Sequence, residues 1–320
     1  MRRRRLYSVR PMKSPTEQNP ITAHIPQNGC AAAEMFLAAF LFATMSCIAH
    51  GYSGRAAWPL VAFARIFVTL VLTLGMMWWF RAPFLFRGTR ELWMRSIFGT
   101  IGLLCTFYSV THLPLTDMVT IFATGPIWIA VILAIVMKQR MPWTVWLYAG
   151  WALLGVYVMY RPRFDAGALP LMVALFGAVA AAAAMVSLSM CHRLHRLSVV
   201  AHFSMCSTAA SLFLCLVSPG RILKGMTLPM WFWLLPMGLA GAFAQILMTS
   251  AYGRGSTTLV ALVGISQIGF AAIYDSFVWG YPFDSWKIAG VSMIAAAIVM
   301  SILKRPTAAT IPANGDHSST

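Results

Sequence analysis

Three ionisable residues fall inside apolar stretches of this sequence, where chemistry is to be sought first: Arg65, His202 and Asp275. A charged side chain costs about 3 kcal/mol at the centre of a bilayer on insertion scales, so such residues commonly bind substrate or couple its movement to an ion. Arg65 can hold an anion or act as a structural anchor with a long stem. Asp275 can carry a proton or pair with a cation, or it can sit solvated near an interface. His202 can titrate near neutral pH or simply be hydrogen-bonded.

A second group of residues in the apolar stretches is uncharged but able to form hydrogen bonds or present aromatic faces. Together such side chains can line an amphipathic cavity for a small molecule. The alternative is that they join helices to one another, a common use of polar side chains in membranes. Pro126 is expected to break or kink its helix and to free carbonyl groups there. The group comprises Thr106, Tyr108, Trp128, Gln245, Thr249, Gln267 and Tyr274.

Other catalytic patterns are weak. His112 and Asp117 have a His-x4-Asp spacing similar to that of membrane glycerolipid acyltransferases, in which the histidine activates a hydroxyl group. The orientation predicted below from the basic residues places this pair outside the cytoplasm, where acyl-CoA, the acyl donor of such enzymes, is not found. An enzyme is therefore the lesser hypothesis. The sequence has no Gly-x4-Gly-Lys-[Ser/Thr] loop, and His192 and His195 lack a third ligand. We therefore expect no ATPase, metal or cofactor.

Composition then identifies the environment of these residues. Of the 320 residues, 59% are hydrophobic and 10% are charged, against roughly a quarter charged in soluble proteins. A soluble particle of this size could not cover so much apolar surface. The net charge of +16 does not indicate a nucleic-acid partner, because the basic residues cluster only at Arg2 to Arg5. The sequence therefore predicts an integral membrane protein in contact with the lipid bilayer.

Apolar stretches long enough to span a bilayer, which takes about 20 residues, occur ten times between charges, prolines and glycines. The connections between them are short, so the protein is expected to be all-α, with no folded soluble domain. The tails at 1–33 and 305–320 are polar and expected to be disordered. The ten predicted spans are 34–51, 57–80, 92–112, 115–137, 143–160, 168–190, 198–217, 228–252, 257–280 and 285–303.

The distribution of Lys and Arg predicts the orientation of these spans. If the N-terminus is cytoplasmic, 17 of the 24 basic residues fall on the cytoplasmic side and 6 on the other, while Arg65 lies within a span. This bias follows the positive-inside rule for a bacterial-type inner membrane. We therefore expect both termini in the cytoplasm.

A weak internal repeat divides the chain into two halves. Residues 109–114 align with 251–256 at an offset of 142, and Gly99 then aligns with Gly241. The predicted units are 34–160 and 168–304, joined by a linker at 161–167. A unit of five spans crosses the membrane an odd number of times, so its copy must be inverted. Inverted repeats are typical of secondary transporters, whose halves exchange conformations around a midplane site.

Several stretches resemble the drug/metabolite transporter superfamily, EamA-like family. They are Gly99 to Gly102, Phe107 to Pro114 and Gly125 to Trp128 in the first half, and Gly241 to Tyr252, Thr258 to Ala261 and Trp279 to Pro282 in the second. The sequence departs from the family at Lys138-Gln139 and Gly280-Tyr281, where the family commonly has Gly-Glu. The resemblance implies a ten-helix carrier with a central cavity between its halves.

The function predicted in this way is secondary transport of small organic metabolites by alternating access. Amino-acid-like, nucleoside-like and drug-like substrates all remain open, as do direction, coupling ion and oligomeric state. A membrane protein without transport activity is the remaining alternative.

Overall fold

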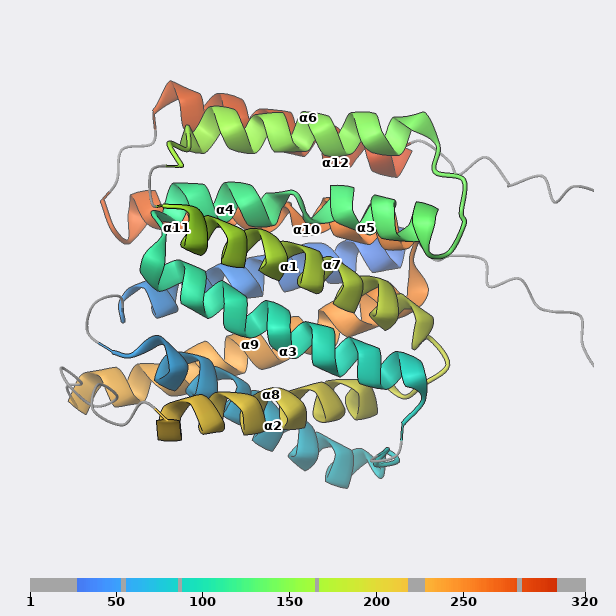
Figure 1. The fold of residues 1–320 in the computed structure, drawn as a ribbon, viewed down its shortest axis with the longest axis vertical. Coiled ribbons are helices and arrows are strands. Elements are labelled where there is room, and N and C mark those ends of the chain that lie inside the picture. Colours follow the sequence, from blue (N-terminus) through green and yellow to red (C-terminus); the bar gives the residue numbers. More distant parts are fainter. Residues whose placement is uncertain are drawn as a thin grey trace, which may run out of the picture.

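The computed structural model describes residues 28–52, 56–85, 88–164, 167–217, 228–280 and 284–303. Most of the expected N-terminal tail and all of the C-terminal one lie outside the described residues. Within these ranges the chain is helical and contains no strand (Figure 1). The helices are α1 (Asn28–His50), α2 (Trp58–Phe80), α3 (Arg90–His112), α4 (Leu115–Ala123), α5 (Gly125–Ile135), α6 (Trp143–Tyr160), α7 (Ala168–Met190), α8 (Arg196–Val217), α9 (Leu228–Arg254), α10 (Thr257–Gly264), α11 (Ser266–Phe277) and α12 (Ser285–Leu303).

Two of the predicted spans are each divided into two helices. The stretch predicted at 115–137 forms α4 and α5, with the break at Thr124. Pro126 lies in the first turn of α5, where its missing N–H leaves no hydrogen bond unmade. The stretch predicted at 257–280 forms α10 and α11, which meet at Ile265 without a proline.

Eight helices in the described part of the chain are long and apolar enough to cross a membrane, when α4–α5 and α10–α11 are each taken as one. The two predicted spans outside this set are α3 and α6. Arg90, Glu91 and Arg95 lower the hydropathy of α3. In α6, three Trp and three Tyr take the place of aliphatic residues. The described part of the chain is thus all-helical, with helices long and apolar enough for an integral membrane protein.

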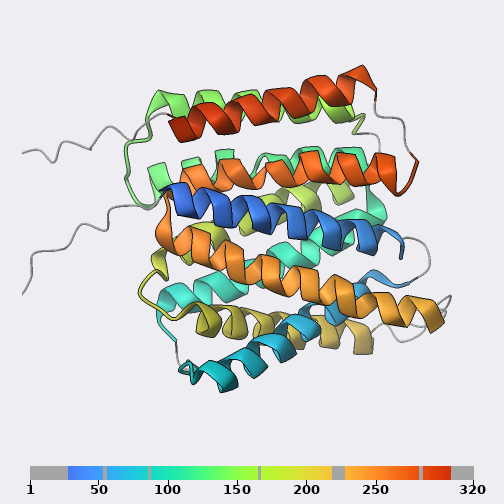
Figure 2. The same cartoon turned by 180° about the vertical axis from the view of Figure 1, so that it is seen from behind.

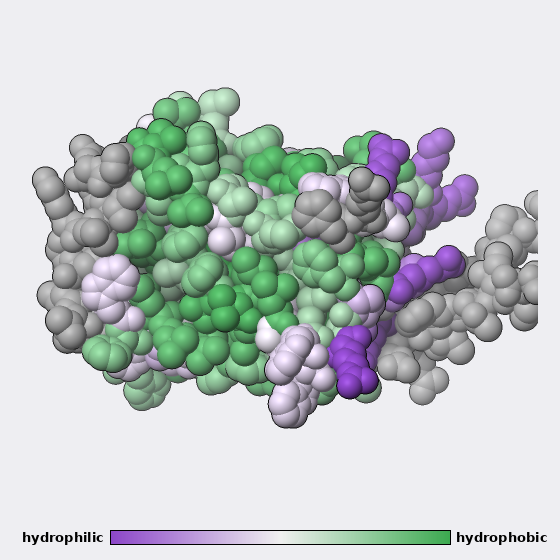
Figure 3. Space-filling model, turned by 90° about the horizontal axis from the view of Figure 1, so that it is seen from below, coloured by the Kyte–Doolittle hydropathy of each residue, from purple (hydrophilic) through white to green (hydrophobic). Residues whose placement is uncertain are grey.

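The outer surface of the bundle is apolar along the middle of the helices. Large side chains such as Phe67, Leu147 and Phe213 are exposed there, as expected for side chains that face lipid. Figure 3 shows one face of the bundle, seen from the side of α2 and α8, which is largely hydrophobic and has strongly hydrophilic side chains gathered toward one end. Polar groups are thereby confined to the ends and the interior.

The helices are arranged in layered pairs (Figures 1 and 2). The outermost layers are α6 with α12 and α2 with α8, while α3 packs on α7 and α1 packs on α9 inside them. Small residues permit the closest approaches. A Cβ on Gly177 would lie 2.6 Å from the Cβ of Cys105, and one on Gly102 would lie 3.1 Å from the backbone nitrogen of Ala181. The small-residue run that begins at Gly177 therefore serves helix packing.

Gly155 and Gly290 form the contact between α6 and α12. A Cβ on Gly290 would lie 2.4 Å from the carbonyl oxygen of Gly155, and a Cβ on Gly155 would lie 2.8 Å from that of Gly290. Backbone atoms cannot move aside as a flexible side chain can. Glycine is therefore required on both helices at this crossing.

We expect Gly155→Leu to destabilise the protein by about 1 to 3 kcal/mol, the usual cost of overpacking. The thermal unfolding midpoint of the purified protein in detergent measures this. Gly150→Leu on the same helix is the matched control, because a Cβ at Gly150 meets no atom within 4 Å. Equal midpoints for the two variants would contradict this contact.

Candidate functional site

A cavity of about 370 Å³ lies in the middle of the bundle, within the range of small-molecule sites. Most of its wall comes from α1, α2, α3, α4, α7, α9 and α11, with single contributions from α6 and α8. Both predicted halves of the chain therefore supply its lining. At one end the cavity reaches the segment that joins α1 to α2, where His50, Tyr52 and Trp58 line it.

Six of the residues singled out in the sequence line this cavity: Arg65, Thr106, Gln245, Gln267, Tyr274 and Asp275. The amide nitrogen of Gln245 is buried and has no hydrogen-bond partner among the described residues. The hydroxyl groups of Tyr274 and Thr44 are 2.8 Å apart and join α11 to α1. The cavity wall is thus partly available for a ligand and partly engaged in holding helices together.

Four other residues proposed for the cavity or its coupling are not among those that line it. Tyr108 packs edge-on against Trp58 and stacks on His112. Trp128 donates its indole N–H to the hydroxyl of Thr124, one turn earlier. These contacts lie within one helix or join neighbouring helices. Tyr108 and Trp128 therefore fit the alternative hypothesis, in which polar side chains stabilise helix packing.

Thr249 and His202 are likewise occupied elsewhere. The Thr249 hydroxyl donates to the carbonyl of Gln245, and its side chain faces a smaller pocket of about 290 Å³ beside His192 and His195. His202 is 1% exposed, and its Nδ1 lies 2.7 Å from the hydroxyl oxygen of Ser96. His202 therefore stabilises the contact between α3 and α8.

Arg65 enters the cavity from α2 between two aromatic rings. Its guanidinium carbon lies 5.7 Å from the ring centre of Phe42 and 5.9 Å from that of Phe107. The Nε atom is buried and has no hydrogen-bond partner among the described residues. A Cβ on Gly241 would lie 3.3 Å from this Nε atom, so glycine at that position leaves room for the arginine.

Arg95 is a charged cavity residue that sequence reasoning missed. The positive-inside distribution places Arg95 with the cytoplasmic charges, because it lies near the beginning of the predicted span 92–112. In the structure it is 1% exposed and lines the cavity, with its guanidinium carbon 4.3 Å from the ring centre of Phe203. The Nε and Nη1 atoms have no partner among the described residues. The sequence does contain a signal for its burial. Arg95 lies three residues after Leu92 and four before Gly99, so the three residues share one helix face.

Asp275 lies in the last turn of α11 at the end of the cavity near the α1–α2 connection. Tyr160 and His50 line the same end. His50 in turn packs edge-on against Trp279, with 5.0 Å between ring centres. Asp275 is half-buried, and its side chain lines the cavity.

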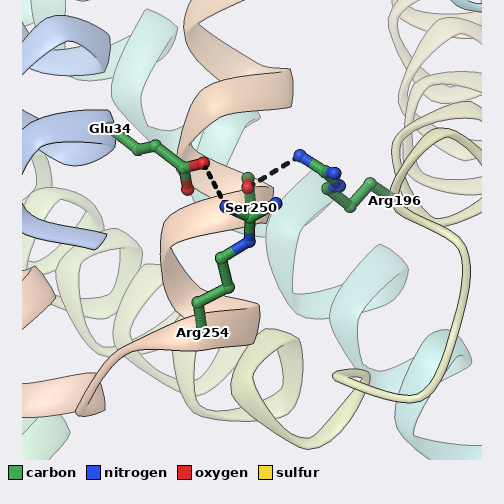
Figure 4. Close-up of polar contacts among 4 residues, drawn as sticks. All are labelled: Glu34, Arg196, Ser250 and Arg254. Atoms are coloured by element: carbon green, nitrogen blue, oxygen red, sulfur yellow. Dashed lines mark hydrogen bonds and ion pairs between the residues drawn. The ribbon is translucent and has the colours of Figure 1, made fainter. Parts of the chain in front are cut away.

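Polar contacts join three helices at the opposite end of the bundle (Figure 4). Glu34 of α1 forms an ion pair with Arg254 of α9 at 3.0 Å. Arg196 at the beginning of α8 donates to the hydroxyl of Ser250 on α9 at 2.9 Å. The Asn28 side chain also accepts the backbone N–H of Ser256. These contacts connect α1 of the first half with α8 and α9 of the second.

Within the described residues no three His, Cys, Asp or Glu side chains come together as ligands. Burial raises the pKa of the Cys191 thiol, just beyond α7, to about 11. This thiol is therefore protonated at neutral pH, and a protonated thiol is a poor ligand and a poor nucleophile.

The proposed His112 and Asp117 pair does not operate as a catalytic unit. Asp117 is 1% exposed, and its two carboxylate oxygens accept the backbone N–H groups of Arg163 and Phe164 at 3.0 Å each. The Nδ1 atom of His112 is 2.8 Å from the carbonyl oxygen of Tyr108. Asp117 thus holds the segment after α6, in which Phe164 has φ of +58°.

Comparisons with known proteins agree with this fold. Residues 30–161 match the model of the EamA-like transporter family. The Pseudopaline exporter CntI of Pseudomonas aeruginosa strain UCBPP-PA14 is 26% identical over 272 residues, which cover 84% of this chain and 95% of the exporter. The protein of the same name from strain PAO1 gives the same values. One crystal structure superposes with a TM-score of 0.72 at 14% identity, over 85% of this chain and 96% of the other, and shares the fold.

We expect Asp117→Ala to destabilise the protein by about 1 to 3 kcal/mol, because it leaves two backbone N–H groups without their acceptor. His112→Ala, at an exposed position, is the control and should change stability little. Thermal unfolding of both variants in detergent makes the comparison. A stable Asp117→Ala protein would contradict the structural role of this carboxylate.

Proposed function

We propose that the protein is an EamA-like transporter that moves small organic metabolites across the inner membrane by alternating access, because residues 30–161 match the model of that family. The family and the exporter relative indicate a membrane transporter of small molecules and not an enzyme. The central cavity between the two predicted halves is the observation that carries the proposal. Because the relative is named an exporter, we propose export as the direction.

The proposal includes ten spans in two inverted units, 34–160 and 168–304. Corresponding helices of these units lie in the same layers: α1 with α7, α3 with α9, and α2 with α8 (Figures 1 and 2). The contacts between helices follow the same correspondence. In one pair α3 packs on α7, and in the other their counterparts, α9 and α1, pack on each other. The helix breaks at Thr124 and Ile265 also correspond. Such equivalence allows the halves to exchange conformations around the cavity.

The proposed orientation has both termini in the cytoplasm. At the end of the bundle that holds the Glu34–Arg254 ion pair, the described connections carry most of the basic residues, among them Arg81, Lys138 and Arg193. Arg161, Arg163 and Lys287 lie at the opposite end. This distribution supports the positive-inside assignment. With it, the contacts in Figure 4 close the cytoplasmic end, and the cavity extends toward the outside.

Transport by the purified full-length protein in liposomes tests the function. The vesicles are loaded with a mixture of amino acids, nucleosides and other metabolites, and efflux is followed by mass spectrometry under imposed proton or sodium gradients. We expect at least one compound to leave faster than from vesicles without protein. If nothing in a broad mixture moves under any gradient, the alternative of a membrane protein without transport activity is favoured.

Asp275 is the proposed proton-coupling residue, because it is the described carboxylate that lines the cavity. Asp275→Asn keeps the shape of the side chain but cannot release a proton. We expect this variant to lose the acceleration of transport by a proton gradient, as measured by initial rates at several external pH values. Asp284→Asn, at an exposed position before α12, is the control. An unchanged pH dependence in Asp275→Asn would exclude this role.

A further inference from the structure

We propose that the cavity accepts a small organic acid, whose carboxylate or phosphate group pairs first with Arg65 and, farther in, with Arg95. This inference rests on the proposed function and names the substrate class of the same site. It goes beyond that function because it replaces three open classes of metabolite by one chemical requirement, a negative charge.

The charge balance of the cavity is the first argument. Two guanidinium groups line it, and no described carboxylate forms an ion pair with either of them. Most of the other described carboxylates are engaged elsewhere: Glu34 pairs with Arg254, Asp117 accepts two backbone N–H groups, and Asp284 accepts the N–H of Lys287. Asp275 is the one described carboxylate in the cavity wall, so the two arginines leave an excess of positive charge.

The surroundings of the two arginines are the second argument. Their closest aromatic neighbours are Phe203 for Arg95 and Phe42 and Phe107 for Arg65. A cation over a ring is stabilised, but the ring accepts none of the hydrogen bonds that a guanidinium donates. Nε of both residues and Nη1 of Arg95 are buried without an acceptor. A planar guanidinium in this state is suited to bind a carboxylate or phosphate through two hydrogen bonds.

The glycines beside the arginines are the third argument. A Cβ on Gly99 would lie 2.0 Å from Nη1 of Arg95, and a Cβ on Gly241 would lie 3.3 Å from Nε of Arg65. Both glycines are in helices, where alanine is intrinsically more stable by about 1 kcal/mol. The chain therefore keeps open the space that each guanidinium group occupies. Gly99 and Gly241 are also the two positions that align in the internal repeat.

The two arginines stand at different depths of the cavity. Arg65 lies seven residues after the beginning of α2, or about 10 Å along it, and Arg95 lies five residues after the beginning of α3, or about 8 Å along it. These helices are consecutive and run in opposite directions (Figure 1). An acid that enters near His50 meets Arg65 first and Arg95 farther in, while Gln245 and Gln267 can accept hydrogen bonds from its polar body.

Binding to the purified full-length protein tests the substrate class. The ligands are adipate, its neutral diamide adipamide, and glycerol 3-phosphate, and affinity is measured by titration calorimetry. We expect adipate or glycerol 3-phosphate to bind at least ten-fold more tightly than adipamide. The comparison of the two acids decides whether carboxylate or phosphate is preferred. If neither acid binds, or adipamide binds equally well, the inference is wrong.

The variant Arg65→Met/Arg95→Met removes both charges and keeps side chains of comparable length. We expect it to bind the acids at least ten-fold more weakly, while its unfolding midpoint without ligand is unchanged or higher, because two unpaired buried charges are gone. Arg90→Met, exposed at the beginning of α3, is the control with unchanged binding. Equal acid affinity in the double variant would overturn the proposal. If the double variant does not fold, Arg65→Lys/Arg95→Lys replaces it. Lysine keeps the positive charge but cannot donate the two parallel hydrogen bonds of a guanidinium group, so adipate should still bind more weakly.

The liposome assay separates this inference from the proposed function. If neutral metabolites are transported while the acids neither bind nor move, the protein is a transporter and the acid requirement is wrong. If the acids bind through the arginines but no compound is transported, the anion site stands and the proposed function fails.

Discussion

The lack of water in the bilayer core is the constraint on which the structure depends. Every backbone N–H and C=O group in that region must be satisfied within the protein, which favours helices. The side chains follow the same constraint: apolar residues such as Phe67 and Phe213 face outward, and polar ones such as Gln245 and Ser96 face inward. The interior is therefore the place where a cavity with polar groups in a mainly apolar wall can form.

Close packing and an internal cavity make opposite demands on the same helices. Glycine and alanine allow α3 to approach α7 and α6 to approach α12, with backbone atoms near van der Waals contact. Around the cavity, glycine serves a different purpose, since Gly99 and Gly241 leave space for arginine side chains. Glycine therefore permits close helix crossings and also leaves space for charged side chains near the centre.

The polar contacts at the two ends of the bundle differ in kind. At the end shown in Figure 4, an ion pair and hydrogen bonds connect α1, α8 and α9. At the other end, the cavity reaches the α1–α2 connection, and the hydroxyl contact between Thr44 and Tyr274 joins α1 to α11. Contacts such as Glu34–Arg254, which is partly exposed, contribute little stability. In the proposed mechanism they can break and re-form as the halves move.

Local sequence was sufficient to determine the class of protein, its helices and the family resemblance, because hydropathy over about 20 residues decides whether a segment partitions into a bilayer. It also identified Arg65, Gln245, Gln267 and Asp275, since polar residues in apolar stretches are rare. Tertiary structure decided which of these side chains share a cavity. His202 and Thr249 satisfy the same polarity rule, but their helix faces turn toward Ser96 and toward a different pocket. Arg95 shows the converse: near a helix end its charge is indistinguishable from a loop charge, and only the packing of α3 against α7 and α8 buries it.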